Sequence, residues 1–230
     1  MLGPFALLLL AVSAIAAARH RRRRRLPGRA VIVSPRRSTV IARDGAVRSV
    51  QTAELSMPLA ELERLWNPTN LENLARTYWR FLTRATLGMI RVVYGEDERA
   101  VVLLVRPLTL LRFGAPEYLL EADRGNVRWR IRGGLLVARA GRGCGFLSVD
   151  VRHAGLTADA RAKLRIEVEV ANFYPAIAAG FSTPVYEMTQ SSIHVLVTHA
   201  FLRSLATLEL AESKVGTLAI PDGGSGSDQP

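Results

Sequence analysis

Residues 50–71 read VQTAELSMPLAELERLWNPTNL, and the apolar pattern changes within this stretch. Val50–Met57 has the alternation of a strand and ends at Pro58. Leu59–Trp66 then places its leucines and its tryptophan at helical spacing, and Asn67-Pro68 interrupts that spacing. The stretch therefore predicts a strand that leads into a short helix, followed by a break.

A second helix is expected after that break. Thr69 or Asn70 can serve as its N-cap, because both side chains accept hydrogen bonds from free backbone amides. The apolar stripe of this helix consists of Leu71, Leu74, Tyr78 and Leu82. We expect the helix to end near Gly88, where the period of the apolar residues changes.

Beyond the second helix, apolar residues recur at every second position. The candidate strands are Ile90–Tyr94, Val101–Val105, Leu108–Phe113, Glu117–Ala122, Val127–Arg132, Leu135–Ala140, Phe146–Val151 and Lys163–Val170. Neighbouring segments among them can be halves of one bent strand. In two of the strands the polar positions are almost all charged, so that Val127, Trp129 and Ile131 alternate with arginines. Such alternation predicts an antiparallel sheet with one buried and one solvated face.

A long helix is expected near the C-terminus. Pro184 can occupy its first turn. The apolar face consists of residues at helical spacing, namely Val185, Met188, Ser192, Val195, Leu196, His199, Leu202 and Ala206. The helix is expected to end near Leu208. The fold class is therefore α+β, with a curved antiparallel sheet and a long C-terminal helix.

The N-terminal segment is expected to be a membrane anchor, since Leu2–Ala18 contains no charged residue. Its 17 residues span about 25 Å as a helix, at the short end of what crosses a hydrocarbon core of about 30 Å. Positive charge follows this segment, which orients the C-terminal part toward the cytoplasm in a single-pass protein. A cleaved secretory signal is the alternative, but the chain has no basic residue before Arg19.

The net charge of +11 is concentrated outside the predicted domain. Residues 1–48 hold 11 arginines and one acid, whereas residues 49–230 hold 20 basic and 19 acidic residues. This distribution argues against a nucleic-acid partner. The arginines expected to contact anionic lipid headgroups are Arg19, Arg21, Arg22, Arg23, Arg24 and Arg25. A topology signal without lipid recognition is the alternative.

The chain divides into four expected parts. Residues 1–18 form the transmembrane anchor, residues 19–48 an arginine-rich juxtamembrane linker, residues 49–210 the folded domain, and residues 211–230 a disordered tail. Within the linker, Val31–Val33 and Thr39–Ile41 can pair as a small hairpin, although a flexible segment is the favoured interpretation.

The order strand, two helices, antiparallel meander and long C-terminal helix resembles the START-like superfamily. This group includes the polyketide cyclase/dehydratase-like and pollen-allergen-like helix-grip domains. Leu55–Trp66, followed by Asn-Pro-Thr-Asn-Leu, looks like the opening of that family, and the resemblance covers residues 49–210. It implies a curved sheet that wraps the last helix and leaves a cavity for lipids, sterols or other apolar molecules. Catalytic residues differ among its members, so the resemblance assigns none.

Five residues are candidates for the lining of such a cavity: Tyr78, Trp129, Phe173, Tyr174 and His199. Each can equally be an ordinary core or turn residue. His199 is also the candidate general base, because histidine titrates near neutral pH. The four histidines lack the spacing of metal ligands, and we expect neither a metal nor another cofactor.

Three functions remain open on these observations. The first is a membrane-tethered START-like domain that binds a lipid or another apolar ligand. The second is an enzyme of the cyclase/dehydratase kind with His199 as base. The third is a scaffold without a ligand cavity. Apolar strands can line a cavity or fill a core, so the sequence does not separate the first function from the third.

Overall fold

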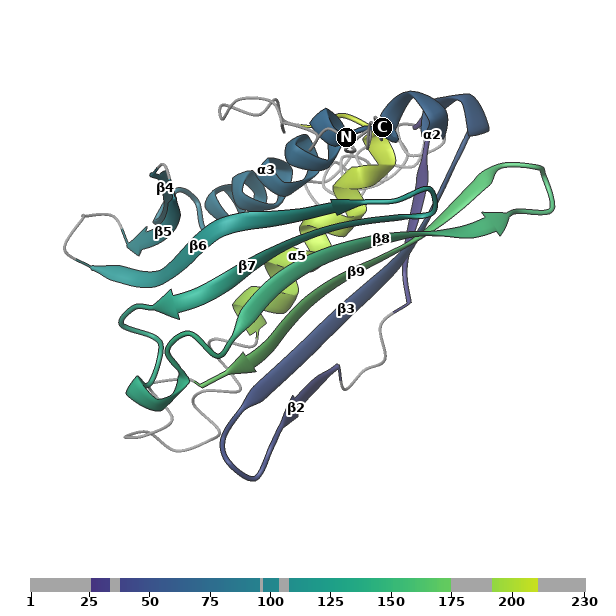
Figure 1. The fold of residues 1–230 in the computed structure, drawn as a ribbon. Coiled ribbons are helices and arrows are strands. Elements are labelled where there is room, and N and C mark those ends of the chain that lie inside the picture. The colour runs from purple at the N-terminus through teal and green to yellow at the C-terminus, as the bar shows by residue number, and fades with distance from the viewer. Residues whose placement is uncertain (1–25, 34–37, 96, 104–107, 175–191, 211–230) are drawn as a thin grey trace, which may run out of the picture.

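The computed structural model describes residues 26–33, 38–95, 97–103, 108–174 and 192–210 (Figure 1). The expected anchor, the arginines at 19–25 and the expected tail at 211–230 lie outside these residues, as does the expected helix start at Pro184. Among the residues that the structure describes, no helix is both long enough and apolar enough to cross a membrane.

The described residues form one antiparallel sheet of nine strands in the order β1-β3-β9-β8-β7-β6-β5-β4, with β2 also paired to β3. The strands are β1 (Arg29–Ile32), β2 (Thr39–Ile41), β3 (Val47–Met57), β4 (Ile90–Tyr94), β5 (Glu98–Leu103), β6 (Thr109–Leu120), β7 (Arg124–Gly133), β8 (Phe146–Leu156) and β9 (Ala162–Phe173). β9 pairs with both β3 and β8 along most of its length, so these three strands form the centre of the sheet.

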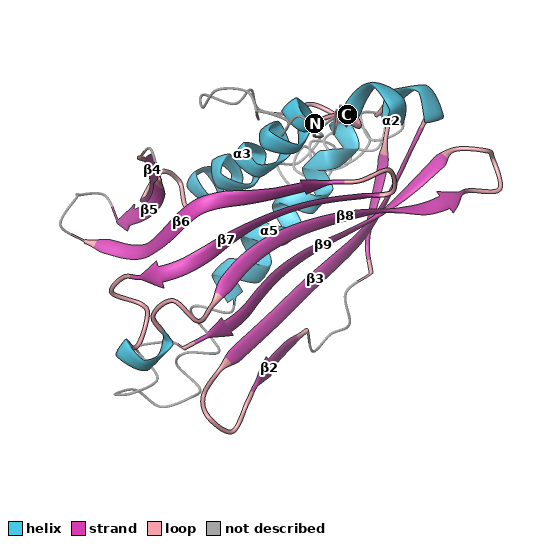
Figure 2. Ribbon diagram, viewed as in Figure 1, coloured by secondary structure: helices cyan, strands magenta, loops and turns pink. Residues whose placement is uncertain are grey.

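The two longer helices of the described part lie on one face of the curved sheet (Figures 1 and 2). α2 (Leu59–Leu65) and α3 (Pro68–Ala85) follow β3, and α5 (Ser192–Ser204) continues into the short 3-10 helix η4 (Leu205–Thr207). Another 3-10 helix, η1 (Arg139–Gly141), lies between β7 and β8. A curved antiparallel sheet around a C-terminal helix is the helix-grip arrangement, so the predicted α+β architecture is confirmed.

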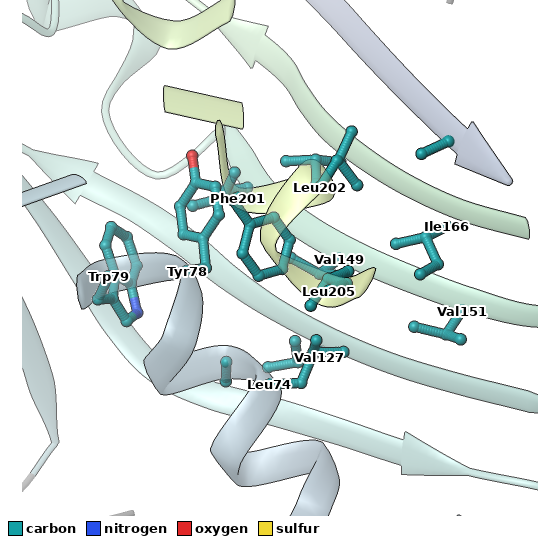
Figure 3. Packing of buried hydrophobic residues seen from close by; sticks show 14 of the residues in the cluster. Leu74, Tyr78, Trp79, Val127, Val149, Val151, Ile166, Phe201, Leu202 and Leu205 are labelled. Atoms are coloured by element: carbon teal, nitrogen blue, oxygen red, sulfur yellow. The ribbon is translucent and has the colours of Figure 1, made fainter. Parts of the chain in front are cut away.

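The core lies between the sheet and the two longer helices. Figure 3 shows Leu74, Tyr78 and Trp79 of α3, Phe201 and Leu202 of α5, and Leu205 of η4 facing strand residues such as Val127, Val149, Val151 and Ile166. The predicted alternation is confirmed in β7 and β9, where Val127, Trp129, Ile131, Leu164, Ile166 and Val168 are buried. The arginine side of β7 lies on the outer face, where Arg130 pairs with Glu117 across the strands.

The structure decides one predicted boundary that the sequence left open and corrects another. Leu108–Phe113 and Glu117–Ala122 belong to one bent strand, Thr109–Leu120, with register shifts opposite β7 at Phe113. The predicted strand Leu135–Ala140 is instead a turn followed by η1. Gly134 causes this turn, because its φ of +127° is strained for other residues and a Cβ would lie 2.3 Å from the Leu110 carbonyl oxygen.

The N-terminal cap of α3 is Asn67, not Thr69 or Asn70. The Asn67 side chain accepts a hydrogen bond from the Asn70 backbone amide at 2.9 Å, and Pro68 occupies the first helical position. Proline is favoured there, because its missing N–H would have no helical partner. The Asn-Pro pair therefore begins the second helix as well as ending the first.

The segment expected to be a flexible linker contributes two strands. β1 and β2 pair with β3 and not with each other as a hairpin, so the expected start of the domain at residue 49 falls inside β3. The local sequence shows only short apolar runs. Their partner strand lies farther along the chain, which local periodicity does not reveal.

Candidate functional site

A cavity of about 190 Å³ lies between the sheet, the C-terminal half of α3 and the described N-terminal part of α5. Its lining is almost entirely apolar and consists of Thr39, Val47, Ser49, Tyr78, Trp79, Leu82, Ile90, Val101, Leu110, Leu111, Phe113, Ile131, Leu136, Leu147, Val170, Phe173 and Val197. We call this region the cavity end of the domain. A cavity of this composition favours an apolar occupant, because burial removes apolar surface from water.

The cavity exists where the side chains of α5 become small. Val197, Phe201 and Leu205 follow one another at intervals of four residues on the buried side of the helix. Phe201 is fully buried and meets Tyr78 edge to face, with 5.4 Å between the ring centroids. Val197, one turn earlier, lines the cavity and leaves its volume unfilled.

The cavity has few polar groups. Thr39 and Ser49 lie in its wall and join their hydroxyl groups at 3.0 Å. Tyr78 contributes a phenol whose pKa is raised by burial. Tyr78 therefore stays protonated at neutral pH. Its hydroxyl can donate a hydrogen bond but is not an anionic base.

Among the predicted lining residues, Tyr78 and Phe173 line the cavity and Trp129 does not. Trp129 is 1% exposed and packs behind the lining against Trp79, with the ring centroids 5.1 Å apart. Both tryptophans face the same core, but Trp79 on α3 reaches the cavity and Trp129 on β7 supports it. Trp129 therefore lies in the core and not in the lining of this cavity.

Tyr174 also lies outside the cavity lining. Its hydroxyl donates to Asp44 Oδ2 at 2.8 Å, and its carbonyl accepts from the Ala138 amide at 2.8 Å. The ring packs directly on Gly141, where an added Cβ would lie only 2.5 Å from the Tyr174 Cβ. Tyr174 therefore links three loops beside the end of β9, which is a structural role.

His199 is not a cavity residue. Its Nε2 lies 2.9 Å from Gln51 Oε1, and Gln51 in turn donates to Ser38 Oγ. Because an amide oxygen can only accept, the contact keeps the proton on Nε2. Partial burial and the nearby Arg203 lower the pKa of His199. The contacts join α5 to β3, and His199 is not among the residues that line the cavity.

The predicted face of α5 is rotated relative to the observed one. The buried residues are Val197, Thr198, Phe201, Leu202, Leu205 and Ala206, whereas His199 is half-buried at the edge of the face. Residues 195–202 are apolar on nearly every side, and such a helix does not show its phase in the sequence. Phe201, the largest buried residue of α5, was missed for this reason.

Several other charged groups, Asp150 of β8 among them, lie on the outer face of the sheet. Burial would raise the pKa of Asp150, but hydrogen bonds from Arg152 and Arg124 hold it below its ordinary value. Asn126 also donates to the same carboxylate at 3.0 Å. These satisfied contacts stabilise neighbouring strands. In the described part of the chain, no group of three His, Cys, Asp or Glu residues is placed to hold a metal ion.

No family model and no curated protein matches this chain. A protein from Arthrobacter aurescens solved by NMR is 12% identical, with a TM-score of 0.34 over 80% of this chain and 95% of that one. Human STARD10 is 11% identical, with a TM-score of 0.30 over 74% and 72%. Ara h 8.0201 is 13% identical, with a TM-score of 0.30 over 70% and 99%. These similarities are too distant to identify a family or a function. The helix-grip architecture follows from the strand order and the helix placement described above.

Proposed function

We propose that this protein binds a small apolar molecule in the cavity between α3, α5 and the sheet. The observation that carries the proposal is the 190 Å³ cavity, whose lining side chains are apolar apart from the hydroxyl groups of Thr39, Ser49 and Tyr78 and the indole N–H of Trp79. A scaffold with a filled core would have no such space. The resemblance of the sequence to START-like domains points in the same direction.

The volume of the cavity limits the size of the ligand. An apolar cavity of about 150 Å³ in another protein accommodates benzene, and pockets for drug-sized ligands occupy about 300–1,000 Å³. The cavity here, at about 190 Å³, therefore suits a molecule of roughly six to ten carbon atoms. The two acyl chains of a phospholipid exceed it. One hydroxyl or carbonyl group on the ligand has partners in the Thr39–Ser49 pair or in Tyr78.

The proposal includes a membrane tether. Leu2–Ala18 is apolar and is followed at once by the arginines that would contact the cytoplasmic headgroups. Alkaline extraction of membranes from cells that express the full chain tests this part. A tethered chain stays with the lipid, whereas release into the supernatant would contradict the tether.

An enzymatic function has less support. The candidate base His199 contacts Gln51 and does not line the cavity. The polar groups of its lining residues are two hydroxyl groups bonded to each other, a phenol with a raised pKa and the indole N–H of Trp79. None of these is a strong base at neutral pH.

Photoaffinity labelling tests where the ligand binds. The full chain in phospholipid nanodiscs is exposed to a diazirine analogue of octan-1-ol, and labelled peptides are identified by mass spectrometry. We expect label on peptides that contain cavity residues such as Leu82 and Phe173. The matched control is Val197→Phe, which fills the cavity and should remove this label. Labelling of the same peptides to the same extent in Val197→Phe would contradict the proposal.

A further inference from the structure

A surface groove of about 500 Å³ lies at the end of the domain remote from the cavity. It runs between α2 and the tip of the β8–β9 hairpin, and its rim carries Leu59 and Leu156, which are 46% and 61% exposed. Leu62 and Trp66 form part of its floor. We call this region the groove end.

The floor of the groove is held in place. The Trp66 ring meets the His153 ring edge to face at a centroid distance of 4.2 Å, and Trp66 Nε1 donates to the Glu121 carbonyl oxygen at 2.9 Å. These contacts satisfy the indole N–H of Trp66, while Leu59 and Leu156 at the rim remain exposed. The groove is therefore a fixed feature with an apolar rim.

The chain reaches the domain at this same end. Arg161, at the start of β9, donates to the Pro27 carbonyl oxygen at 2.6 Å. Gly28 donates to the carbonyl oxygen of Ala206 at 3.0 Å, and Arg29 lies opposite Ser56 in the β1–β3 register. Pro27 is therefore fixed beside the groove, directly after the arginine run that ends at Arg25. Residues 19–25 span at most about 25 Å even when fully extended.

The charged groups around the groove mostly pair with one another. Arg64 pairs with Glu61 at 2.7 Å, and Lys163 pairs with Glu54 at 3.0 Å. Arg152 on β8 is likewise bonded to Asp150. The rim thus has two exposed leucines among paired charges, together with the exposed carboxylate of Glu63. The excess of positive charge lies in the adjoining arginine run.

We propose that the groove end docks on the bilayer surface, with Leu59 and Leu156 inserted among the upper acyl chains and the arginine run on anionic headgroups. This inference rests on the proposed tether. The length of chain before Pro27 and its fixed point beside the groove select a lipid surface over other partners. β8 runs from the cavity end to the groove end and is roughly 35 Å long. The cavity therefore faces away from the bilayer and takes its ligand from the aqueous side.

The single cysteine of the chain provides a matched pair of reporters. Cys144 is exposed in the turn before β8, at the cavity end. A second protein, Leu156→Cys with Cys144→Ser, places the label at the groove end. Each full chain is labelled with an environment-sensitive nitrobenzoxadiazole dye and reconstituted in vesicles of phosphatidylcholine and phosphatidylglycerol. We expect blue-shifted emission and quenching by doxyl-labelled lipids at residue 156, and neither effect at Cys144. Equal quenching at both positions, or none at residue 156, would overturn the inference.

A second substitution separates docking from mere proximity. Leu59→Glu should reduce the quenching at residue 156. The control Leu135→Glu changes another exposed leucine, near the cavity end, and should leave the quenching unchanged. A dye at residue 156 that is protected from aqueous iodide but not quenched by doxyl lipids would indicate the N-terminal segment or a second copy in the groove, contrary to the inference. In a flotation assay, vesicles that rise without the bound chain would overturn both the tether and the docking. Ligand binding is tested separately, by the photoaffinity labelling of the cavity.

Discussion

The two ends of the domain are built from the same sheet and the same two longer helices, yet one end is hollow and the other is packed. At the groove end, Leu71 and Leu74 of α3 and Leu205 of the 3-10 helix η4 meet the strands and leave a gap of only about 80 Å³. At the cavity end, about 190 Å³ remains open. The difference depends on which side chains the helices direct inward, since β3, β8 and β9 pass through both ends. In this domain, the size of the side chains on the helices therefore decides which end of the sheet has a cavity.

Phe201 marks the boundary between the packed and the hollow region. Phe201→Ala should lower the free energy of unfolding by about 3–5 kcal/mol, because it removes a fully buried ring from contacts with Tyr78 and Phe81. Denaturant titration measures this change. Arg203→Ala, at an exposed position of the same helix, is the control and should change stability little. A loss under about 1 kcal/mol for Phe201→Ala would show that the boundary region is loosely packed.

Val197→Phe tests the opposite change one turn earlier on α5. We expect complete loss of ligand binding, with a free energy of unfolding within about 1.5 kcal/mol of the parent protein, because the larger ring enters existing space. Calorimetry and denaturant titration together give both quantities. A large loss of stability with ligand binding intact would mean that the cavity lies elsewhere.

The length of the ligand offers a sharper test of cavity size. In a series of straight-chain alcohols, affinity should rise by about 0.8 kcal/mol per methylene while the chain fits, and then level off or fall. From the cavity volume of about 190 Å³, we expect the change near eight to ten carbons, about the size inferred above. An affinity that rises steadily to dodecanol would indicate an open groove rather than a bounded cavity.

The packed end also depends on the cap of α3. Asn67→Ala should lower the free energy of unfolding by about 1 kcal/mol, since it removes the acceptor for the Asn70 amide. Thr69→Ala is the matched control at an exposed neighbouring position, and its effect should be much smaller. A larger loss of stability for Thr69→Ala than for Asn67→Ala would contradict Asn67 as the N-cap and favour Thr69, one of the two positions expected from the sequence.

The smallest expected effect concerns pH. Because partial burial and Arg203 lower the pKa of His199 in the folded state, the unfolded chain binds the proton more readily. The stabilisation from neutral His199 is therefore fully present above the ordinary histidine pKa of about 6.5 and is lost as the pH falls below it. His199→Gln should flatten this part of the stability profile, measured by denaturant titration from pH 7.5 to 5. An identical slope in the variant would contradict this assignment.

Much of the sheet could be predicted because its strands alternate cleanly. Val127, Trp129 and Ile131 face the core between exposed or half-exposed arginines, and the same period identifies β9. The partners of β1 and β2 were not predictable, because pairing with β3 depends on contacts beyond the local sequence. The turn after Gly134 was mistaken for a strand because apolar residues continue through it.

The candidate site was predicted only in part. Tyr78 and Phe173, two of the five candidates, line the cavity, whereas Trp79 and Val197 also line it and were not among the candidates. His199 lies at the edge of the buried face of α5 and contacts Gln51. An apolar residue gives no local sign of whether it fills a core or borders a cavity. The volume depends on the combined size of side chains from the sheet and both helices, which only the three-dimensional arrangement brings together.

The most direct test of ligand binding is a calorimetric titration of the full chain with p-xylene in phospholipid nanodiscs. Subtraction of the heat measured with Val197→Phe in identical nanodiscs removes the contribution from partition into lipid. We predict a saturable difference that fits one site per chain, with the negative heat-capacity change of apolar burial. Superimposable titrations of the two proteins would contradict the account, because the cavity at Val197 would then bind nothing.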